Sequence, residues 1–486
     1  MAIDTSPSPA RSSAPPTADA GMTTRAKLTL LVLCAAQFIV ALDFSILNVA
    51  LPVLGDDLGM GQADLQWAVT AFALPSGGFL LLSGRLGDLH GRRRLFLAGL
   101  ALFTVASVLA TLAWNPAVFL AGRALQGLGA AAVVPAGMAL LTTTFPEGPQ
   151  RERALGISST LLSLGFTVGM LLGGVMTDGL GWRSTMGLLS VAGVGVLLVA
   201  PGLLAESRNP DRPRLDLPGA ATVTGGLLAL IYALSTAAQR GFGGADVLVT
   251  LIAGPVLLVA FVLVESRAAE PLVSLPMLRR RTVAFGNLAG LVTFSMMSTV
   301  VFLLTLYLQE VLGLSAFRTG LIFGVEGVFA VAAGMTASRV IARFGTRTTL
   351  VGGLLVQAVF TALLLLVGGT SGAWLALVGT SLAVVGHLWA IVAYGVTATS
   401  GVPNSEQGLA TGLVTSSQQI GLTVGIPLLS AVASARTAAL SSDGAGFGAA
   451  TLGGIKLGLG VDAAVVAAVA VLVAVGLRRT RPANGG

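Results

Sequence analysis

Charged residues are scarce in this sequence of 486 residues: Asp, Glu, Lys and Arg make up 10%, and hydrophobic residues make up 54%. Soluble globular proteins carry about 25% charged residues, so the composition excludes an ordinary soluble domain. The formal net charge of +7 could point to nucleic acid, but the basic residues stand in short segments between apolar runs. That is the pattern of membrane topology, and no nucleic-acid partner is expected.

Cysteine and histidine are nearly absent. Cys34 is the single cysteine, which excludes internal disulfides and cysteine-based metal sites. With only His90 and His387, imidazole metal chemistry is not expected either, and neither is a resident cofactor. A membrane-embedded enzyme would need a metal or nucleophile constellation that these residues do not provide, so the sequence argues against an enzyme. Nothing resembles a nucleotide-binding loop, which argues against direct use of ATP.

Apolar runs of about 20 residues recur along the chain, and a run of that length crosses a bilayer as a helix. A β-barrel would need short alternating segments, which are absent. The sequence therefore predicts an all-α integral membrane protein with fourteen transmembrane helices. Their expected centres lie near Val40, Leu74, Val105, Ala131, Thr167, Val194, Leu227, Val256, Val300, Phe329, Thr361, Ala390, Val424 and Val469.

Basic residues are distributed unequally between the two sides of these spans. If both termini are cytoplasmic, most of the 28 Lys and Arg residues fall in cytoplasmic segments, as the positive-inside rule requires. Residues 1–27 are rich in Ser, Pro, Ala and Thr and are expected to form a disordered cytoplasmic tail, with a second tail at 479–486. High usage of Ala, Gly, Val and Arg favours a bacterium with a GC-rich genome, and hence a location in the bacterial cell membrane.

A charged island, GRLGDLHGRRRLF, runs from Gly84 to Phe96 between the second and third spans. Its glycines permit a tight turn, and Asp88 lies among arginines, where it could change partners when neighbouring helices move. A purely topogenic basic loop would explain the arginines but not the spaced glycines and the aspartate. The island resembles the loop signature of the major facilitator superfamily, which implies a cytoplasmic gate. The matching residues are Gly84, Leu86, Gly87, Asp88, Gly91, Arg92 and Arg93.

A second copy of the island, SRVIARFGTRTTL, begins at Ser338. Gly91 aligns with Gly345 and Arg93 with Arg347, whereas Asp88 has no acidic counterpart. The copies lie eight spans apart, which predicts two six-helix bundles with two helices inserted between them. The expected segments are an N-terminal bundle at 28–205, a linker with the inserted helices at 206–267, and a C-terminal bundle at 268–478.

The first span contains Asp43 deep among apolar residues, in the stretch ALDFSILNVALP. A charge there costs about 3 kcal/mol on insertion scales, so Asp43 should be protonated or should face a wet cavity. The stretch, including Asn48, resembles the first-helix signature of the fourteen-span drug:proton antiporter family, with Ser45 in place of the usual threonine. The resemblance implies a proton or cation site at Asp43. A structural hydrogen bond to a neighbouring helix is the alternative.

The fourth span carries Arg123 and Gln126 in the stretch RALQGLG. An arginine inside a span must pair, hydrogen-bond or reach water. The stretch matches a second pattern of the antiporter family, which implies that Arg123 tunes proton affinity nearby. Arg123 could instead extend to the cytoplasmic boundary as a packing element.

Small residues recur four apart in the fifth span, which favours close helix packing. The stretch GFTVGMLLGG resembles the exporter signature of the antiporter family through Gly165, Gly169, Gly173 and Gly174. Met170 stands where that signature has proline, which weakens the inference of export because a built-in kink is lost.

Glu326 lies within the tenth span without a charged neighbour in sequence. We hypothesise that Asp43 and Glu326 are the two carboxylates of one central cavity, where they attract a cationic substrate or carry protons. His387 is expected to be a satisfied core residue, with a role as a proton carrier as the alternative, and Asp462 is expected near an outer helix end. The further polar residues expected at cavity depth are Asn48, Gln126, Gln418, Gln419 and Trp389.

The resemblance implies a proton-coupled multidrug efflux transporter that exports small amphipathic, cationic compounds by alternating access. Its expected partners are the small-molecule substrate, protons and the lipid bilayer, and a monomer is expected. Two other functions stay open: export of one endogenous metabolite or antibiotic, and proton-coupled import of a nutrient.

Overall fold

The computed structural model describes residues 22–145, 149–206, 216–241, 243–268, 271–273, 275–368, 372–402 and 407–478, and these residues form helices and no strand. Most of the predicted N-terminal tail and all of the C-terminal tail lie outside the described residues. Helix α1 begins at Thr24, where the hydroxyl of Thr23 accepts a hydrogen bond from the Ala26 backbone N–H (3.2 Å). The first helix therefore starts inside the segment predicted as a tail.

The N-terminal part of the chain contains α1 (Thr24–Leu58), α2 (Gln62–Gly78), α3 (Leu80–His90), α4 (Arg92–Thr111), α5 (Pro116–Thr144), α6 (Pro149–Leu180) and α7 (Arg183–Leu203). Two helices follow, α8 (Leu217–Arg240) and α9 (Ala245–Glu265). The C-terminal part contains α10 (Leu275–Leu278), α11 (Arg281–Leu306), η1 (Tyr307–Val311), α12 (Ala316–Phe344), α13 (Thr346–Leu363), η2 (Leu364–Leu366), α14 (Gly372–Thr399), α15 (Gln407–Ser442) and α16 (Phe447–Gly476).

The helices have the length and composition of membrane spans. Among the described residues, 12 helices are long and apolar enough to cross a bilayer, and the bent pair of α2 and α3 would make 13. Helix α6 adds an apolar segment at Leu164–Leu180. Large apolar side chains such as Leu198 (79% exposed) cover the outer faces, as expected for contact with lipid. The protein is a multi-pass membrane protein; the count of fourteen and the cytoplasmic termini stay predictions.

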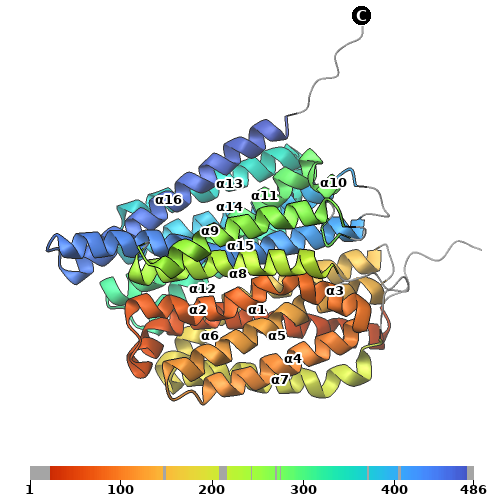
Figure 1. Cartoon of the computed structure of the whole chain (residues 1–486), viewed down its shortest axis with the longest axis horizontal. Helices are drawn as coiled ribbons and strands as arrows, with labels where there is room; N and C mark the ends of the chain where they lie inside the picture. The colour runs from red at the N-terminus through yellow and green to blue at the C-terminus, as the bar shows by residue number, and fades with distance from the viewer. Residues whose placement is uncertain are drawn as a thin grey trace, which may run out of the picture.

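The two halves of the chain repeat the same helix pairings. In the first half α1 packs on α6, α4 on α5 and α7, and α2 on α5; in the second half α11 packs on α15, α13 on α14 and α16, and α12 on α14. The halves meet where α6 contacts α12 and where α2 contacts α15. Helices α8 and α9 lie outside both bundles and cover the α2–α15 contact through α8 (Figure 1). This is the arrangement that the internal repeat predicted.

The aligned loop glycines adopt the same role in both bundles. Gly91 (φ 110°) ends α3 and begins α4, and Gly345 (φ 82°) ends α12 and begins α13. Only glycine adopts such angles without strain. Arg93 then donates to the Pro201 backbone oxygen near the end of α7 (2.7 Å), and Arg347 donates to the Ala474 oxygen near the end of α16 (2.6 Å). The repeat therefore extends to individual contacts.

The glycine motif of α6 lets two neighbouring helices approach at backbone distance. A Cβ atom at Gly165 would lie 3.0 Å from the Phe38 carbonyl oxygen, and one at Gly173 would lie 2.6 Å from the Ile46 carbonyl oxygen, both in α1. Gly174 faces the other half of the protein, since its Cβ would lie 2.7 Å from the Ala316 oxygen of α12. The motif thus packs α6 inside its own bundle and also across the interface between the bundles.

Replacement of Gly173 by leucine is expected to separate α6 from α1 and to destabilise the protein by about 1–3 kcal/mol, the usual cost of overpacking. The measurement is the thermal unfolding temperature of the purified protein in detergent. The matched control is Gly179→Leu in the same helix, where nothing lies within 4 Å of the added Cβ. Equal unfolding temperatures for the two variants would contradict the packing role of Gly173.

Candidate functional site

Helix α1 carries two polar faces with different surroundings. Gln37, Phe44 and Asn48 share one face and line the central cavities. Asp43 is fully buried and is not among the residues that line either cavity. The hypothesis that Asp43 and Glu326 face one cavity is therefore wrong. Phe44 faces the cavity, and Asp43, the preceding residue of the helix, points about 100° away from it.

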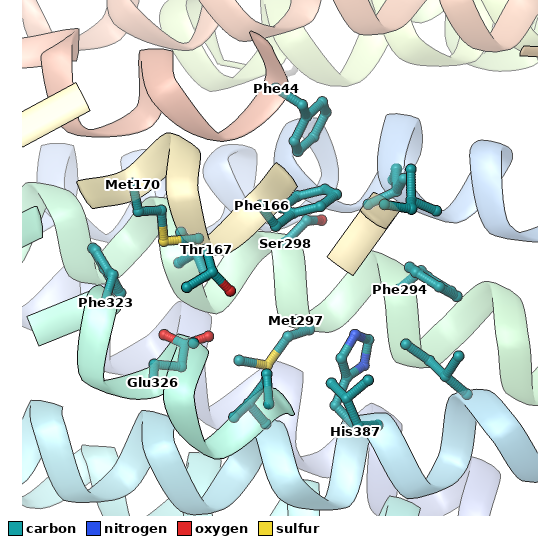
Figure 2. A pocket seen from close by; sticks show the side chains of 18 of the residues that line it. Phe44, Phe166, Thr167, Met170, Phe294, Met297, Ser298, Phe323, Glu326 and His387 are labelled. Atoms are coloured by element: carbon teal, nitrogen blue, oxygen red, sulfur yellow. The ribbon is translucent and has the colours of Figure 1, made fainter. Parts of the chain in front are cut away.

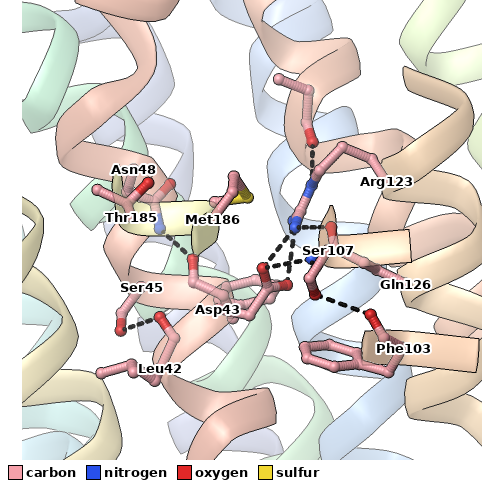
Figure 3. A network of polar contacts seen from close by, with 12 residues as sticks. Leu42, Asp43, Ser45, Asn48, Phe103, Ser107, Arg123, Gln126, Thr185 and Met186 are labelled. Atoms are coloured by element: carbon pink, nitrogen blue, oxygen red, sulfur yellow. Dashed lines mark hydrogen bonds and ion pairs between the residues drawn. The ribbon is translucent and has the colours of Figure 1, made fainter. Parts of the chain in front are cut away.

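Asp43 forms a buried ion pair with Arg123 of α5 (Figure 3). Arg123 Nη1 donates to both carboxylate oxygens, at 2.6 Å and 2.8 Å, and the two side chains are 0% and 1% exposed. Arg123 Nε also donates to the Ala68 backbone oxygen of α2 (3.0 Å), and its Cζ lies 4.6 Å from the ring centre of Phe72. These additional contacts offset the desolvation of the pair. The alternative in which Arg123 extends to the membrane boundary is excluded.

Gln126 completes this network. Its Oε1 accepts a hydrogen bond from Arg123 Nη1 (2.8 Å), and its Nε2 donates to Ser107 Oγ of α4 (2.8 Å). Gln126 is fully buried and lines neither cavity, so its prediction as a cavity residue was wrong. Its face of α5 is turned toward α4 instead. The network therefore joins α1, α2, α4 and α5 inside the N-terminal bundle.

The central cavity lies between the two bundles and has a volume of about 170 Å³. Helices α1, α6, α11, α12, α14 and α15 line it. Its wall is rich in aromatic rings and thioethers, from Phe44, Phe166, Met170, Phe294, Met297 and Phe323 (Figure 2). A second cavity of about 110 Å³ shares Phe44 and Gln418 with it and extends toward α2 and α5. Such a wall suits the flat apolar part of a ligand.

Glu326 supplies a carboxylate to this apolar wall. The residue is 5% exposed and lines the cavity, and Figure 2 shows its side chain pointing from α12 toward Thr167. Its Oε2 is buried and has no hydrogen-bond partner among the described residues. A buried carboxylate oxygen without a partner in apolar surroundings favours either protonation or the approach of a positive charge.

The other predicted cavity residues divide into two groups. Asn48, Gln418 and Gln419 line the cavities, as predicted. Trp389 does not, because its Nε1 donates to Thr336 Oγ1 of α12 (3.3 Å) on another side of α14. His387, which the sequence predicted as a core residue, lines the cavity from α14 together with Val384, Leu388 and Ile391.

The loop signature forms a polar cluster at one end of the N-terminal bundle. Arg92 pairs with Asp88 across the turn at Gly91 (2.8 Å), so the aspartate is held by its own loop. The sequence did not predict a role for Glu206, which follows α7. Its Oε1 accepts from the Arg93 backbone N–H (3.2 Å), and the carboxylate would collide with a Cβ at Gly91. Glu206 therefore connects the end of α7 to the turn, and the acidic residue directly after a span was the available signal.

Asp462 does not lie at an outer helix end. It is fully buried about halfway along α16, and neither carboxylate oxygen has a hydrogen-bond partner in the described part of the chain. Within the same residues, no three His, Cys, Asp or Glu side chains gather in a group that could hold a metal ion.

Comparison with known proteins gives one family. A profile described as "Major Facilitator Superfamily" matches residues 33–426. The "Cephamycin export protein CmcT" of Amycolatopsis lactamdurans is 38% identical over 442 residues, which cover 85% of this chain and 86% of that protein. The "Puromycin resistance protein pur8" of Streptomyces alboniger is 38% identical over 451 residues and covers 92% and 89% of the two chains. The "Multidrug resistance protein Stp" of Mycobacterium tuberculosis is 32% identical over 408 residues, or 84% and 76%.

Solved structures share the fold. The crystal structure of the POT family transporter PepTSo matches with a TM-score of 0.69 at 14% identity, over 92% of this chain and 98% of that one. A bacterial homolog of the human lysosomal transporter Spinster matches with a TM-score of 0.63 at 18% identity, over 95% and 100%.

The buried ion pair yields a double-mutant prediction. Asp43→Asn and Arg123→Met should each destabilise the protein by about 3–5 kcal/mol, because each leaves one buried charge without its partner. The double variant should lose much less than the sum of the two single losses. Thermal or denaturant unfolding in detergent measures the three values.

Arg94→Met is the matched control, since Arg94 is 71% exposed and pairs with Glu206 at 3.6 Å. An exposed pair contributes about 0–1 kcal/mol, so this change should have little effect. Strictly additive losses for Asp43 and Arg123 would show that the two side chains stabilise the fold independently.

Proposed function

This chain belongs to the major facilitator superfamily, and on that basis we propose that it exports small amphipathic, cationic compounds across the bacterial cell membrane in exchange for protons. The observation that carries the proposal is the central cavity between the bundles, with its aromatic and thioether wall and the carboxylate of Glu326. Transport rather than catalysis agrees with a site that offers a binding surface and no nucleophile constellation.

The cavity favours a positive charge over a negative one. Two oxygen acceptors of lining residues, Glu326 Oε2 and Asn48 Oδ1, are buried without a hydrogen-bond donor among the described residues. The orientation of the Asn48 amide is fixed, because its Nδ2 donates to the Phe44 backbone oxygen (2.9 Å). A cation that carries N–H groups would satisfy such acceptors, whereas an anion would be repelled by Glu326.

The size of the cavity supports alternating access. At about 170 Å³ it is smaller than the ~300–1,000 Å³ of pockets that hold drug-sized ligands. A substrate of that size therefore requires the bundles to move apart on one side. The contacts that would change are the α6–α12 and α2–α15 interfaces, where the halves meet.

Small residues at the α6–α12 interface would allow such a motion. A Cβ at Gly320 of α12 would lie 2.7 Å from the Met170 oxygen, and one at Gly174 of α6 would lie 2.7 Å from the Ala316 oxygen. Helices that touch through backbone atoms can slide without the interlocking of large side chains. Met170 itself lines the cavity, so its side chain occupies substrate space where the exporter signature has proline.

Proton coupling is assigned to Asp43, with Arg123 as its modulator. Protonation of Asp43 would remove the negative charge and leave Arg123 buried without a counter-ion, which is costly. The network would then rearrange, and it includes contacts to α2, the helix that meets α15 of the other bundle. Phe44, the next residue along α1, lines both cavities. Proton binding and substrate binding therefore act on the same helix from different faces.

Dedicated export of one antibiotic is the second candidate. Two of the relatives carry printed names that refer to cephamycin export and puromycin resistance, which favours a substrate of natural-product type. A panel of cations and antibiotics in one transport assay separates the candidates, since a dedicated exporter responds to one compound. Import, the remaining alternative, would show accumulation of opposite sign under the same proton gradient. Because both cavities lie within one chain, we propose a monomer as the transporting unit.

Asp43→Asn should abolish substrate-driven proton movement. In liposomes with an internal pH-sensitive dye, ethidium should trigger proton flow through the wild type and none through the variant. Ethidium binding should change less than about 2-fold, because Asp43 lies outside the cavity. The matched control is Asp57→Asn, a half-exposed acid near the end of the same helix, which should retain coupling. Proton flow that persists in Asp43→Asn would remove Asp43 from the coupling path.

Glu326→Gln should weaken the binding of ethidium at least about 10-fold, because the carboxylate supplies the negative charge of the cavity. Binding of neutral phenanthridine, which shares the ring system, should change little. Fluorescence titration of the purified protein measures both affinities. If Glu326→Gln left the binding and transport of every cation unchanged, Glu326 would be a structural residue.

A further inference from the structure

A chain of three polar side chains supports one wall of the central cavity. Gln357 of α13, Thr293 of α11 and His387 of α14 come from three helices of the C-terminal bundle. Gln357 and Thr293 are fully buried, and His387 is 7% exposed and lines the cavity. The proton network described above does not include them.

Close helix packing brings these three polar side chains together. A Cβ at Gly353 of α13 would lie 2.6 Å from the Gly386 oxygen of α14. Helices in contact at backbone distance place Gln357, one turn after Gly353, at the level of His387, which follows Gly386. Two glycines therefore position this polar chain.

The backbone oxygen of Thr293 determines which group donates in each hydrogen bond among these three side chains. The carbonyl oxygen of Thr293 can only accept, so the group of Gln357 that lies 3.4 Å from it is the amide Nε2. The amide oxygen Oε1 of Gln357 then faces the Thr293 hydroxyl, which donates to it. With its proton used, Thr293 Oγ1 accepts from His387 Nδ1 at 2.9 Å. The proton of the neutral ring is thus on Nδ1.

The remaining ring nitrogen of His387 is therefore a hydrogen-bond acceptor. Among the described residues His387 forms no ion pair, and a buried imidazolium without a counter-ion is costly, which favours the neutral ring. The ring is held edge-to-face against Phe294, with centroids 5.3 Å apart and an interplanar angle of 80°. Figure 2 shows the ring rising from α14 into the cavity, with Phe294 and Met297 beside it.

We propose that His387 Nε2 is a specificity-determining acceptor that binds an N–H or O–H group on the aromatic body of the substrate. This inference rests on the proposed function and names its substrate class: an aromatic cation whose charge is bound at Glu326 and whose separate hydrogen-bond donor is bound at His387. Thr293 and Gln357 are positioning residues, because they fix the proton on Nδ1. Met297 lies between Glu326 and His387 in the wall, so the two polar contacts are separated by apolar surface (Figure 2).

The test compares two cations that differ only in hydrogen-bond donors: ethidium, which has two aromatic amines, and 5-ethyl-6-phenylphenanthridinium, which has none. His387→Phe keeps an aromatic ring and removes the acceptor. It should weaken ethidium binding about 5- to 10-fold and change binding of the amine-free cation less than about 2-fold. Thr293→Val should reduce the preference for ethidium by a smaller factor, because either ring nitrogen can then carry the proton. Met297→Leu, the matched control, should change both affinities by the same factor.

A spectroscopic measurement tests the assignment without relying on affinities. The chain has two histidines, so the variant His90→Gln with ¹⁵N-labelled histidine reports on His387 alone. The nitrogen shifts should show a protonated Nδ1 and an unprotonated Nε2, and ethidium should shift the Nε2 signal.

The outcomes are distinguishable. If the wild type binds neither cation, the proposed function fails and this inference fails with it. If the wild type binds both and His387→Phe changes both equally or neither, only the role of His387 is overturned. A proton found on Nε2 in the absence of ligand would also overturn it.

Discussion

The hydrocarbon core of a bilayer offers no hydrogen bonds, and this constraint accounts for the surroundings of most charged side chains in the spans. Such a group usually finds a partner inside the protein or faces the cavity; Asp462, buried in α16 with neither carboxylate oxygen bonded among the described residues, is an exception. Asp43 and Arg123 satisfy each other at 2.6 Å. Gln357, Thr293 and His387 hydrogen-bond to one another, which leaves one ring nitrogen of His387 for another partner. Glu326 faces the cavity, and in the proposed function a cationic substrate is its partner.

The Asp43–Arg123 ion pair and the cavity that contains Glu326 lie on different faces of α1. Asp43 points from α1 into the N-terminal bundle, and Phe44 points from α1 into the cavity. In the proposed mechanism, this separation keeps the bound proton and the cationic substrate from competing for one carboxylate. The proposed coupling requires α1 to transmit a change at its bundle face to its cavity face, as a rigid helix can do by a small rotation or shift.

Glycines set the distances between the helices that carry these polar sites. Gly165 and Gly173 hold α6 against α1, Gly174 and Gly320 bring the bundles together, and Gly353 aligns the polar chain at His387. In each case backbone atoms occupy the space of a side chain. Such contacts give short, defined distances between helices while leaving few large side chains to obstruct a relative motion of the bundles.

The sequence by itself determined the fold class, because the cost of burying backbone in lipid allows only helices for apolar runs of this length. It also determined the turns at Gly91 and Gly345, since their positive φ angles are a local property. What it could not determine is which side chains meet. Arg123 and Asp43 are 80 residues apart, Gln126 is turned toward Ser107 rather than the cavity, and His387 rather than Trp389 lines the cavity. The direction in which a residue points is fixed by the rotation and crossing of its helix against its neighbours, and that depends on packing across the whole bundle.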